Sequence, residues 1–265
     1  MGTYERAKPV EETATIAANR QLAAGIYMVE LEAPEIASRA RPGQFVHMQV
    51  PGMEGHILRR PFSLCSWGEG RVGIMYQVVG YGTGRLSELE PGTEASLMGP
   101  IGRGWNPPDG TRHAVLVCGG MGVAPQMMLA GQLVRTGARV DCLLGATNAE
   151  RLVGVEELRS QGAFVYISTD DGSVGYHGFC TDLIAENARD ADYISVCGPE
   201  PMEKAAVSAI HALGPSETRT CEVSLERRMA CGIGACLSCV VDTVSGKKRA
   251  CVDGPVFEVG EVVWR

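Results

Sequence analysis

Four cysteines near the end of the chain have the spacing of an iron–sulfur site. Cys231, Cys236 and Cys239 form a C-x4-C-x2-C run, and Cys251 follows further along. Two bridged irons need four converging thiolates, and this run brings three of them around one small volume. A zinc ribbon would favour two C-x2-C pairs, and structural cysteines are a further alternative. The spacing therefore predicts a [2Fe–2S] cluster, and one-electron chemistry, at these four residues.

The sequence around the other six cysteines predicts a different role for them. They lie in apolar or strand-like surroundings, where free cysteine behaves as a small buried hydrophobe. These residues are Cys65, Cys118, Cys142, Cys180, Cys197 and Cys221. Within the cluster run itself, Gly232, Gly234 and Ala235 are small enough to let the backbone wrap closely and aim N–H groups at sulfur.

A tetrapeptide in the first half of the chain has the residue types of a flavin site. In Arg60-Pro61-Phe62-Ser63, strand alternation would send Arg60 and Phe62 one way and Pro61 and Ser63 the other. Arg60 can pair with a pyrophosphate, Phe62 can cover an aromatic ring and Ser63 can hydrogen-bond a ring nitrogen. An ordinary strand with one exposed arginine is the alternative. Flavin is the usual converter between a one-electron centre and a two-electron nicotinamide.

A glycine-rich turn adds to this prediction. Gly80-Tyr81-Gly82-Thr83-Gly84 precedes a short helix expected over residues 85–89, with Thr83 as its N-cap. A glycine-rich turn at a helix N-terminus can bind an anion, so Gly82 and Thr83 are expected to contact the FAD pyrophosphate. A simple capped turn is the alternative.

Two further loops predict a nicotinamide dinucleotide site. Gly119, Gly120 and Gly122 follow the expected strand 114–117 and open a helix, where backbone N–H groups can approach phosphate. A second loop, Cys197-Gly198-Pro199, follows a later strand and is expected to face the same crevice. Asp170 ends another strand; beside a ribose it would favour NAD over NADP, although a solvated turn explains it as well.

The surrounding pattern indicates a β + α/β fold in three parts. Six short β-runs precede residue 104, at 14–16, 25–31, 45–50, 58–66, 72–79 and 94–98, which indicates a six-stranded antiparallel β-barrel for FAD. Parallel strands at 114–117, 140–144, 164–168, 193–196 and 220–223 alternate with helices at 126–135, 155–160, 181–187 and 202–213, as in a doubly wound parallel-sheet NAD domain. A small C-terminal [2Fe–2S] module completes the chain. The expected boundaries are 1–108, 109–219 and 220–265.

Composition excludes several classes of function. The net charge of −7 and the pI near 5.3 leave no basic face for nucleic acid. The most apolar stretch, residues 115–129, is interrupted by glycines and proline and is shorter than the ~20 residues of a membrane span. Residues 1–12 have no apolar signal-peptide core. A cytoplasmic chain is therefore expected.

Together these motifs resemble the electron-transfer subunit of class 1B dihydroorotate dehydrogenases, in the ferredoxin-reductase superfamily. The resemblance covers essentially the whole chain and is most specific in the run Leu225–Cys236 and in the ending Cys251-Val252-Asp253-Gly254-Pro255. It implies FAD, a [2Fe–2S] cluster and NAD(H) as co-substrate. It also implies that Met75-Tyr76-Gln77 touches FAD, although relatives often have Arg at Gln77 and Tyr at Phe62.

The resemblance also implies a role in pyrimidine biosynthesis. Two such subunits would join two FMN-containing catalytic subunits in a heterotetramer, and electrons would pass from FMN through the cluster and FAD to NAD+. The chain itself has no dihydroorotate site, so no catalytic residue is predicted in it. The small subunit of an NADH-dependent ferredoxin:NADP oxidoreductase or of a sulfide dehydrogenase shares this chemistry. A non-enzymatic flavin and iron–sulfur redox sensor is an alternative of another class.

Overall fold

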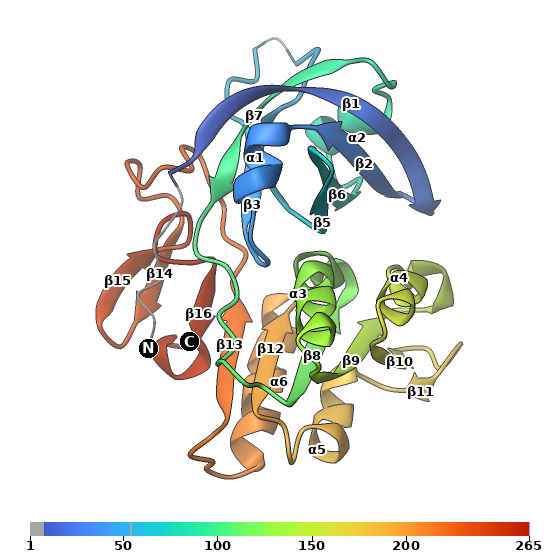
Figure 1. Ribbon diagram of the computed structural model, residues 1–265, viewed down its shortest axis with the longest axis vertical. Coiled ribbons are helices and arrows are strands. Elements are labelled where there is room, and N and C mark those ends of the chain that lie inside the picture. The colour runs from blue at the N-terminus through green and yellow to red at the C-terminus, as the bar shows by residue number, and fades with distance from the viewer. Residues whose placement is uncertain (1–7, 54, 265) are drawn as a thin grey trace.

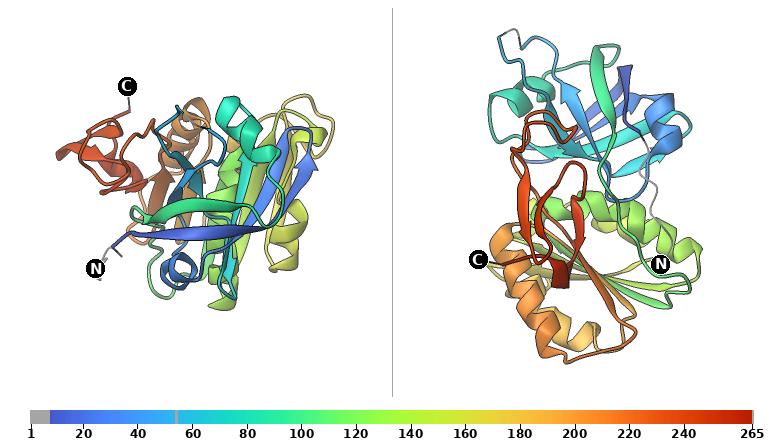
Figure 2. Two further views of the ribbon diagram at one scale, coloured as in Figure 1. Left: turned by 90° about the horizontal axis from the view of Figure 1, so that it is seen from above. Right: turned by 90° about the vertical axis from the view of Figure 1, so that its left-hand side faces the viewer.

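The computed structural model describes residues 8–53 and 55–264, which form three packed parts. Figure 1 shows a β-barrel above an α/β domain, with a small C-terminal module along one side of both. The side view in Figure 2 shows the loop of this module rising from the α/β domain to the barrel. The loop that carries the cluster cysteines therefore lies where the module meets the barrel (Figure 2).

The first part is an antiparallel sheet that rolls into a barrel. Its strand order is β4-β3-β7-β1-β2-β6-β5. The two edge strands, β4 and β5, are joined by Leu64 and Cys65 alone; Leu64 N–H donates to Gln44 O (3.1 Å) and Cys65 N–H to Gly73 O (2.9 Å), so the two edges meet. The strands are β1 (Val10–Ala23), β2 (Ile26–Glu32), β3 (Phe45–Gln49), β4 (Arg60–Ser63), β5 (Ser66–Gly68), β6 (Arg71–Gln77) and β7 (Glu94–Ile101).

The predicted antiparallel barrel is confirmed, with seven strands in the described residues rather than six. The run expected at 58–66 divides into β4 and β5, because the chain turns from one edge of the sheet to the other at Leu64 and Cys65. β1 is much longer than the run expected at 14–16, since one half pairs with β7 and the other with β2. Two short helices, α1 (Pro34–Arg39) and α2 (Tyr81–Ser87), cover the barrel.

The second part is a doubly wound parallel sheet, as predicted. Its order is β11-β10-β9-β8-β12-β13-β16, in which β16 alone is antiparallel to its neighbour. The chain builds outward from β8 through β9 and β10 and then crosses to β12, so the strand order reverses between β8 and β12. The strands are β8 (His113–Gly119), β9 (Arg139–Ala146), β10 (Phe164–Thr169), β11 (Tyr176–His177), β12 (Tyr193–Cys197), β13 (Thr220–Ser224) and β16 (Val256–Glu258).

Helices cover both faces of this sheet. The core on the α3 side includes Met28, Met75 and Trp105 from the barrel segment, so α3 joins the two domains, as Figure 1 also shows. α5 and α6 pack on the other face. Among the described residues, no helix is long and apolar enough to span a membrane. The helices are α3 (Ala124–Arg135), α4 (Val155–Ser160), α5 (Ile184–Asn187) and α6 (Glu200–Ala212), with 3-10 turns η1 (Gly120–Val123), η2 (Ala149–Arg151), η3 (Cys180–Leu183) and η4 (Val259–Glu261).

The C-terminal module is a loop followed by a hairpin of β14 (Val240–Thr243) and β15 (Gly246–Arg249). Segment 220–265 also supplies β13 and β16 to the α/β sheet, so the module shares backbone pairing with that domain. The interdomain linker is paired with it as well, because Arg103 N–H donates to Gly254 O. Within the segment, Leu225 N–H donates to Pro255 O. The domain boundaries themselves stay predictions.

Candidate cofactor sites

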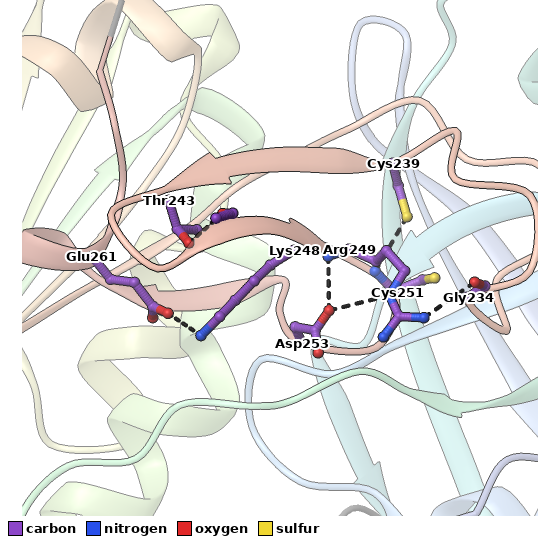
Figure 3. Close-up of polar contacts among 9 residues, drawn as sticks. Gly234, Cys239, Thr243, Lys248, Arg249, Cys251, Asp253 and Glu261 are labelled. Atoms are coloured by element: carbon purple, nitrogen blue, oxygen red, sulfur yellow. Dashed lines mark hydrogen bonds and ion pairs between the residues drawn. The ribbon is translucent and has the colours of Figure 1, made fainter.

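The hairpin positions two of the four cluster cysteines. Cys239 immediately precedes β14 and Cys251 follows β15, with Ala250 between. Continued pairing joins Ala250 N–H to Cys239 O (2.9 Å), and Cys251 N–H donates to Cys239 Sγ (3.5 Å). Figure 3 shows the two sulfur atoms on the same side of the hairpin. The strand register therefore brings a buried pair of thiols together without any contribution from the preceding loop.

The loop before the hairpin builds a second pair. Cys236 N–H donates to Cys231 Sγ (3.4 Å), and N–H groups of Ile233 and Ala235 also approach this sulfur. Burial alone would raise the pKa of the Cys231 thiol, but these donors outweigh it and lower the pKa from 9.0 to about 6. A thiol that ionises this readily is suited to binding a metal.

The four thiols are arranged as two pairs. Cys231 contacts Cys236, and Cys251 contacts Cys239. Two bridged irons require two such pairs. A zinc site would need all four around one ion. The four cysteines therefore fit the predicted [2Fe–2S] cluster.

The six remaining cysteines differ from Cys231 in their electrostatic character. Among the four cluster cysteines, Cys251 resembles these six, because burial and the adjacent Cys239 raise its pKa to about 12. Burial raises the pKa of Cys65, Cys142 and Cys180 to about 12 and that of the half-buried Cys221 to about 11. Burial also raises the pKa well above its ordinary value at Cys118 and Cys197. The five buried side chains pack in the apolar cores, as the sequence predicted.

An arginine that the sequence prediction missed fastens the cluster loop to the hairpin. Arg249 Nη1 donates to Gly234 O (3.3 Å), and its Nε and backbone N–H donate to Asp253 Oδ2 (3.3 and 2.8 Å). Figure 3 shows this side chain spanning from Asp253 to the loop at Gly234. The sequence signal available for Arg249 was its position in a basic run just before the ligand Cys251.

The predicted flavin residues Arg60 and Gly82 lie side by side. A Cβ atom on Gly82 would be 3.1 Å from Arg60 Nε, so the missing side chain makes room for the guanidinium at the first turn of α2. Within residues 8–53 and 55–264, Arg60 has no carboxylate partner, and its Nη1 donates to Leu58 O. Backbone N–H groups of a first helical turn lack helical acceptors. The donor set therefore fits an anionic group such as a pyrophosphate.

The role predicted for Thr83 as an N-cap is wrong. α2 begins at Tyr81, four residues earlier than expected, with Gly80 as its N-cap. Thr83 is the third helical residue, and its Oγ1 accepts from Val79 N–H (2.9 Å) and Gly80 N–H (3.2 Å). The backbone of Gly80 is extended and its N–H bonds to the Thr83 side chain, so the helix starts before Thr83 is reached.

The other predicted flavin residues divide between the two surfaces of the barrel. Strand pairing places Phe62 opposite Val46 and inside the barrel, where it meets the Tyr76 ring edge-on at 6.0 Å. Tyr76 is also interior, and its hydroxyl bonds Asn19 Oδ1 (3.0 Å). The alternation predicted for β4 is confirmed, since Pro61 and Ser63 pair on the opposite face. Met75 packs outward against the α3 side, while Gln77 lines the cleft described next.

A cleft of about 650 Å³ opens between the barrel and the carboxyl ends of the parallel strands. Ile26 and Gln77 contribute the barrel wall, and Gly119, Gly120 and Pro199 contribute loops on both sides of the strand-order reversal. This is where open α/β sheets bind ligands. Asp170 also lines the cleft, as a ribose contact would require. The other lining residues are Met121, Gly145, Ala146, Thr147, Arg151, Phe179, Cys180, Thr181, Pro201, Met202 and Ala205.

The structure separates the predicted nicotinamide residues into a front and a back group. Gly122 packs its backbone on Cys197, whose carbonyl oxygen a Cβ atom would overlap, and Gly198 approaches Gly119 in the same way. Gly122, Cys197 and Gly198 therefore hold the two loops together behind the cleft. Gly120 differs, because it has a φ of +52° and open space at its Cβ position.

Several cleft residues were missed by the sequence prediction. Thr147 and Arg151 follow β9, and Phe179 and Thr181 follow β11. They follow the carboxyl ends of strands, as Gly119 and Pro199 do. The topological rule that singled out those two residues would therefore also have found these. None belongs to a glycine-rich motif, which is why motif spacing did not reveal them.

Comparisons with known proteins agree with this geometry. Residues 226–263, which include all four cluster cysteines, match the family model described as the iron–sulfur cluster binding domain of dihydroorotate dehydrogenase B. A solved structure of an NADH-dependent reduced ferredoxin–NADP oxidoreductase superposes with a TM-score of 0.84 at 28% identity, covering 100% of this chain and 92% of that one. The ferredoxin reductase of carbazole 1,9a-dioxygenase shares the fold, with a TM-score of 0.68 at 22% identity over 80% of this chain and 69% of that one.

Curated relatives extend the match over nearly the full length. A Geobacillus sp. (strain WCH70) protein is 40% identical over 261 residues, covering 96% of this chain and 98% of that protein. One from Shouchella clausii (strain KSM-K16) is 39% identical over 258 residues, covering 94% and 96%. Both are named dihydroorotate dehydrogenase B (NAD(+)), electron transfer subunit. Identity of this extent shows that the chain belongs to the family of dihydroorotate dehydrogenase B electron transfer subunits.

Proposed function

We propose that this chain relays electrons between the FMN-containing catalytic subunit of a dihydroorotate dehydrogenase and NAD+, with a [2Fe–2S] cluster and FAD as its carriers. The observation that carries the proposal is that one chain joins two paired-thiol sites to a cleft at the strand-order reversal of an α/β domain. When bound, the cluster supplies one-electron transfer and the flavin converts it to hydride transfer. The polypeptide supplies the ligands, the anion contacts and the shape of the cleft.

The residues divide this work between the parts of the chain. We assign the cluster to Cys231, Cys236, Cys239 and Cys251, and the FAD pyrophosphate to Arg60 with the first turn of α2. The open backbone at Gly120, with Pro199 opposite, would face the nicotinamide dinucleotide in the cleft. Burial of Cys239 and Cys251 in the core shared with α6 places that thiol pair toward the interior. The carriers would therefore be held by rigid elements.

The proposed partner contact is the exposed side of the cluster loop. Cys236 is exposed, and the apolar side chains of Ile233 and Leu237 on either side of it are 56% and 62% exposed. Apolar side chains gathered beside a redox site are typical of a docking surface. We propose that the catalytic subunit binds here, in a heterotetramer with two copies of each chain. A cytoplasmic location stays a prediction.

A second candidate comes from the same chemistry. The solved ferredoxin–NADP oxidoreductase structure matches the whole chain, so a small subunit of such an enzyme is the alternative. Identity is lower there, at 28%, than the 40% with the Geobacillus protein. Co-purification of the chain with its catalytic partner, followed by typing of the partner's flavin, would decide between the two.

The proposal is tested by separating the two halves of the electron path. Cys239→Ala removes a proposed cluster ligand but leaves Arg60 and the cleft intact. This variant should retain NADH oxidation with ferricyanide and lose NAD-linked dihydroorotate oxidation when mixed with the catalytic subunit. Cys221→Ala, at a half-buried cysteine outside the cluster, is the matched control and should retain both activities. Full NAD-linked turnover by Cys239→Ala would show that the cluster is not on the path.

A further inference from the structure

One histidine of the barrel is buried without a partner. Alternation along β3 puts Val46 and Met48 into the barrel core, and sends Phe45 and His47 outward. The His47 side chain is 0% exposed, yet neither Nδ1 nor Nε2 has a hydrogen-bond partner among residues 8–53 and 55–264. Leaving a buried ring N–H without an acceptor costs about 1–3 kcal/mol, so native proteins seldom do so.

The contacts of this ring come from the barrel and from the cluster loop. The Phe45 ring lies at 5.7 Å and is tilted, Pro61 and Met98 are the cross-strand neighbours, and the charge of Arg59 is close enough to affect the ring. A further neighbour is Gly232 of the cluster loop, which directly follows Cys231. A Cβ atom on Gly232 would be 2.8 Å from His47 Nδ1 and 2.9 Å from its Cε1.

The absence of a side chain at Gly232 thus allows a close approach between the barrel histidine and the cluster loop. The φ of +68° at Gly232 and the absent side chain let the loop pass close to the imidazole edge. Burial and the nearby positive charge of Arg59 lower the pKa of His47 to about 4, so the ring is neutral near pH 7. A neutral imidazole carries one N–H donor and one acceptor nitrogen. Phe45, Pro61 and Met98 offer no side-chain oxygen or nitrogen to accept from the ring, which leaves the side of the cluster loop for the acceptor.

We propose that His47 donates its Nδ1–H hydrogen bond to a sulfur of the [2Fe–2S] cluster. This inference deepens the proposed function, because it takes the cluster to be bound at the four cysteines. An N–H donor stabilises the added negative charge of the reduced cluster more than the oxidised one, so it raises the reduction potential. It also ties the flavin-binding barrel to the cluster module by a contact that the polypeptide alone does not provide.

The decisive variant is His47→Leu in the full chain loaded with FAD and cluster. Removal of the donor should make reduction of the cluster roughly tenfold less favourable, a fall of about 59 mV in a one-electron potential. His47→Asn keeps an N–H near the position of Nδ1 and should recover most of the wild-type potential. Met98→Leu is the matched control, because Met98 Cε approaches the same point of Gly232 at 3.0 Å but has no N–H. Its potential should stay at the wild-type value.

A second measurement does not depend on any variant folding. The chain contains five histidines, and we place only His47 against the cluster loop. In protein labelled with 15N-histidine, pulsed EPR of the dithionite-reduced cluster should detect a weakly coupled 15N nucleus. Absence of that coupling in the wild-type protein would overturn the proposal, whatever becomes of His47→Leu.

The outcomes also separate this inference from the proposed function. Protein prepared anaerobically without iron and acid-labile sulfide would refute the proposed function itself. Cluster-loaded His47→Leu with an unchanged cluster potential would refute the hydrogen bond alone. A shift confined to the flavin potential in the same titration would assign the N–H to FAD and would likewise overturn the proposal.

Discussion

The nicotinamide cleft and the cluster loop both depend on glycine, but for different reasons. Behind the cleft, Gly122 is needed because the neighbouring loop runs against it, and a Cβ atom would overlap Cys197 O. In the cluster loop, Gly232 and Gly234 have φ values of +68° and +86°, which turn backbone N–H groups toward sulfur. One site is shaped by backbone packing and the other is defined by side chains that bind directly.

The difference predicts how each region should respond to substitution. A thiolate ligand has no apolar substitute, so its replacement by alanine should remove the cluster completely and affect only the iron. The cleft is assembled from segments of both domains, so single changes there should produce graded effects. The predictions below test this contrast, starting from the largest expected effect.

Cys236→Ala should abolish cluster binding and leave FAD in place. The thiol belongs to the exposed Cys231/Cys236 pair, whereas Arg60 and α2 lie on the barrel. Iron and acid-labile sulfide should fall close to zero, and the flavin absorbance should stay. Cys221→Ala is the control, because burial raises the pKa of that thiol to about 11 and it has no place in either pair. A full complement of iron in Cys236→Ala would contradict the ligand assignment.

The ligands could be predicted from sequence because spacing along one short segment defines them. The barrel, the parallel sheet and helix 155–160 were likewise accessible from periodicity, since each element buries its own apolar face. His47 and Arg249 were not, because their roles depend on approaches between distant segments, at Gly232 and at Gly234. The start of α2 was misplaced because a glycine N-cap leaves no side-chain signal, unlike the threonine that was chosen.

Glu203 lies between the Gly198 loop behind the cleft and the segment that leads into the cluster loop. Its carboxyl group should make the stability of the chain depend on pH. Glu203 lies on α6 beneath the Gly198 loop, is 1% exposed, and Glu226, Arg227 and Glu200 surround it. Burial raises the pKa of this carboxyl from 4.5 to about 8, while the Gly198 N–H opposes the shift. The folded chain therefore keeps a proton that the unfolded chain releases above pH 4.5, so stability should fall as pH rises from 4.5 to 8.

Glu203→Gln should remove that fall, which is on the order of a few kcal/mol for a shift of this size. The measurement is the apparent Tm of both forms between pH 4.5 and pH 8, where the folded carboxyl keeps a proton that the unfolded one has released. Glu200→Gln on the same helix is the control: Glu200 is 51% exposed and Lys204 lowers its pKa. Parallel Tm profiles for wild type and Glu203→Gln would show that this carboxyl does not carry the dependence.

Arg60→Ala should weaken FAD binding by about 1.5–3 kcal/mol, the usual contribution of a hydrogen bond to a charged group. The guanidinium lies against Gly82, where the first turn of α2 offers further donors to the same anion. FAD dissociation measured by flavin fluorescence gives the difference directly. Arg71→Ala is the control, because Arg71 pairs with Glu32 (3.1 Å) on the exposed barrel surface. Equal FAD affinity in Arg60→Ala and wild type would assign the pyrophosphate elsewhere.

Gly122→Ala and Gly120→Ala should separate packing from ligand approach within one loop. At Gly122 the new methyl group would meet the Cys197 carbonyl and the Gly198 nitrogen, so both loops must shift, at a cost of about 1–3 kcal/mol in stability. At Gly120 the methyl group meets no atom within 4 Å, and only the φ of +52° opposes it, by about 1–2 kcal/mol.

Because Gly120 faces the cleft, Gly120→Ala should raise KM for NADH more than Gly122→Ala does. Gly122→Ala should lower Tm more than Gly120→Ala does. Neither variant should change the EPR spectrum of the cluster, since the hairpin and loop that hold the thiols lie outside this contact. If Gly120→Ala left KM unchanged and Gly122→Ala left Tm unchanged, the division of this loop into a front and a back would be wrong.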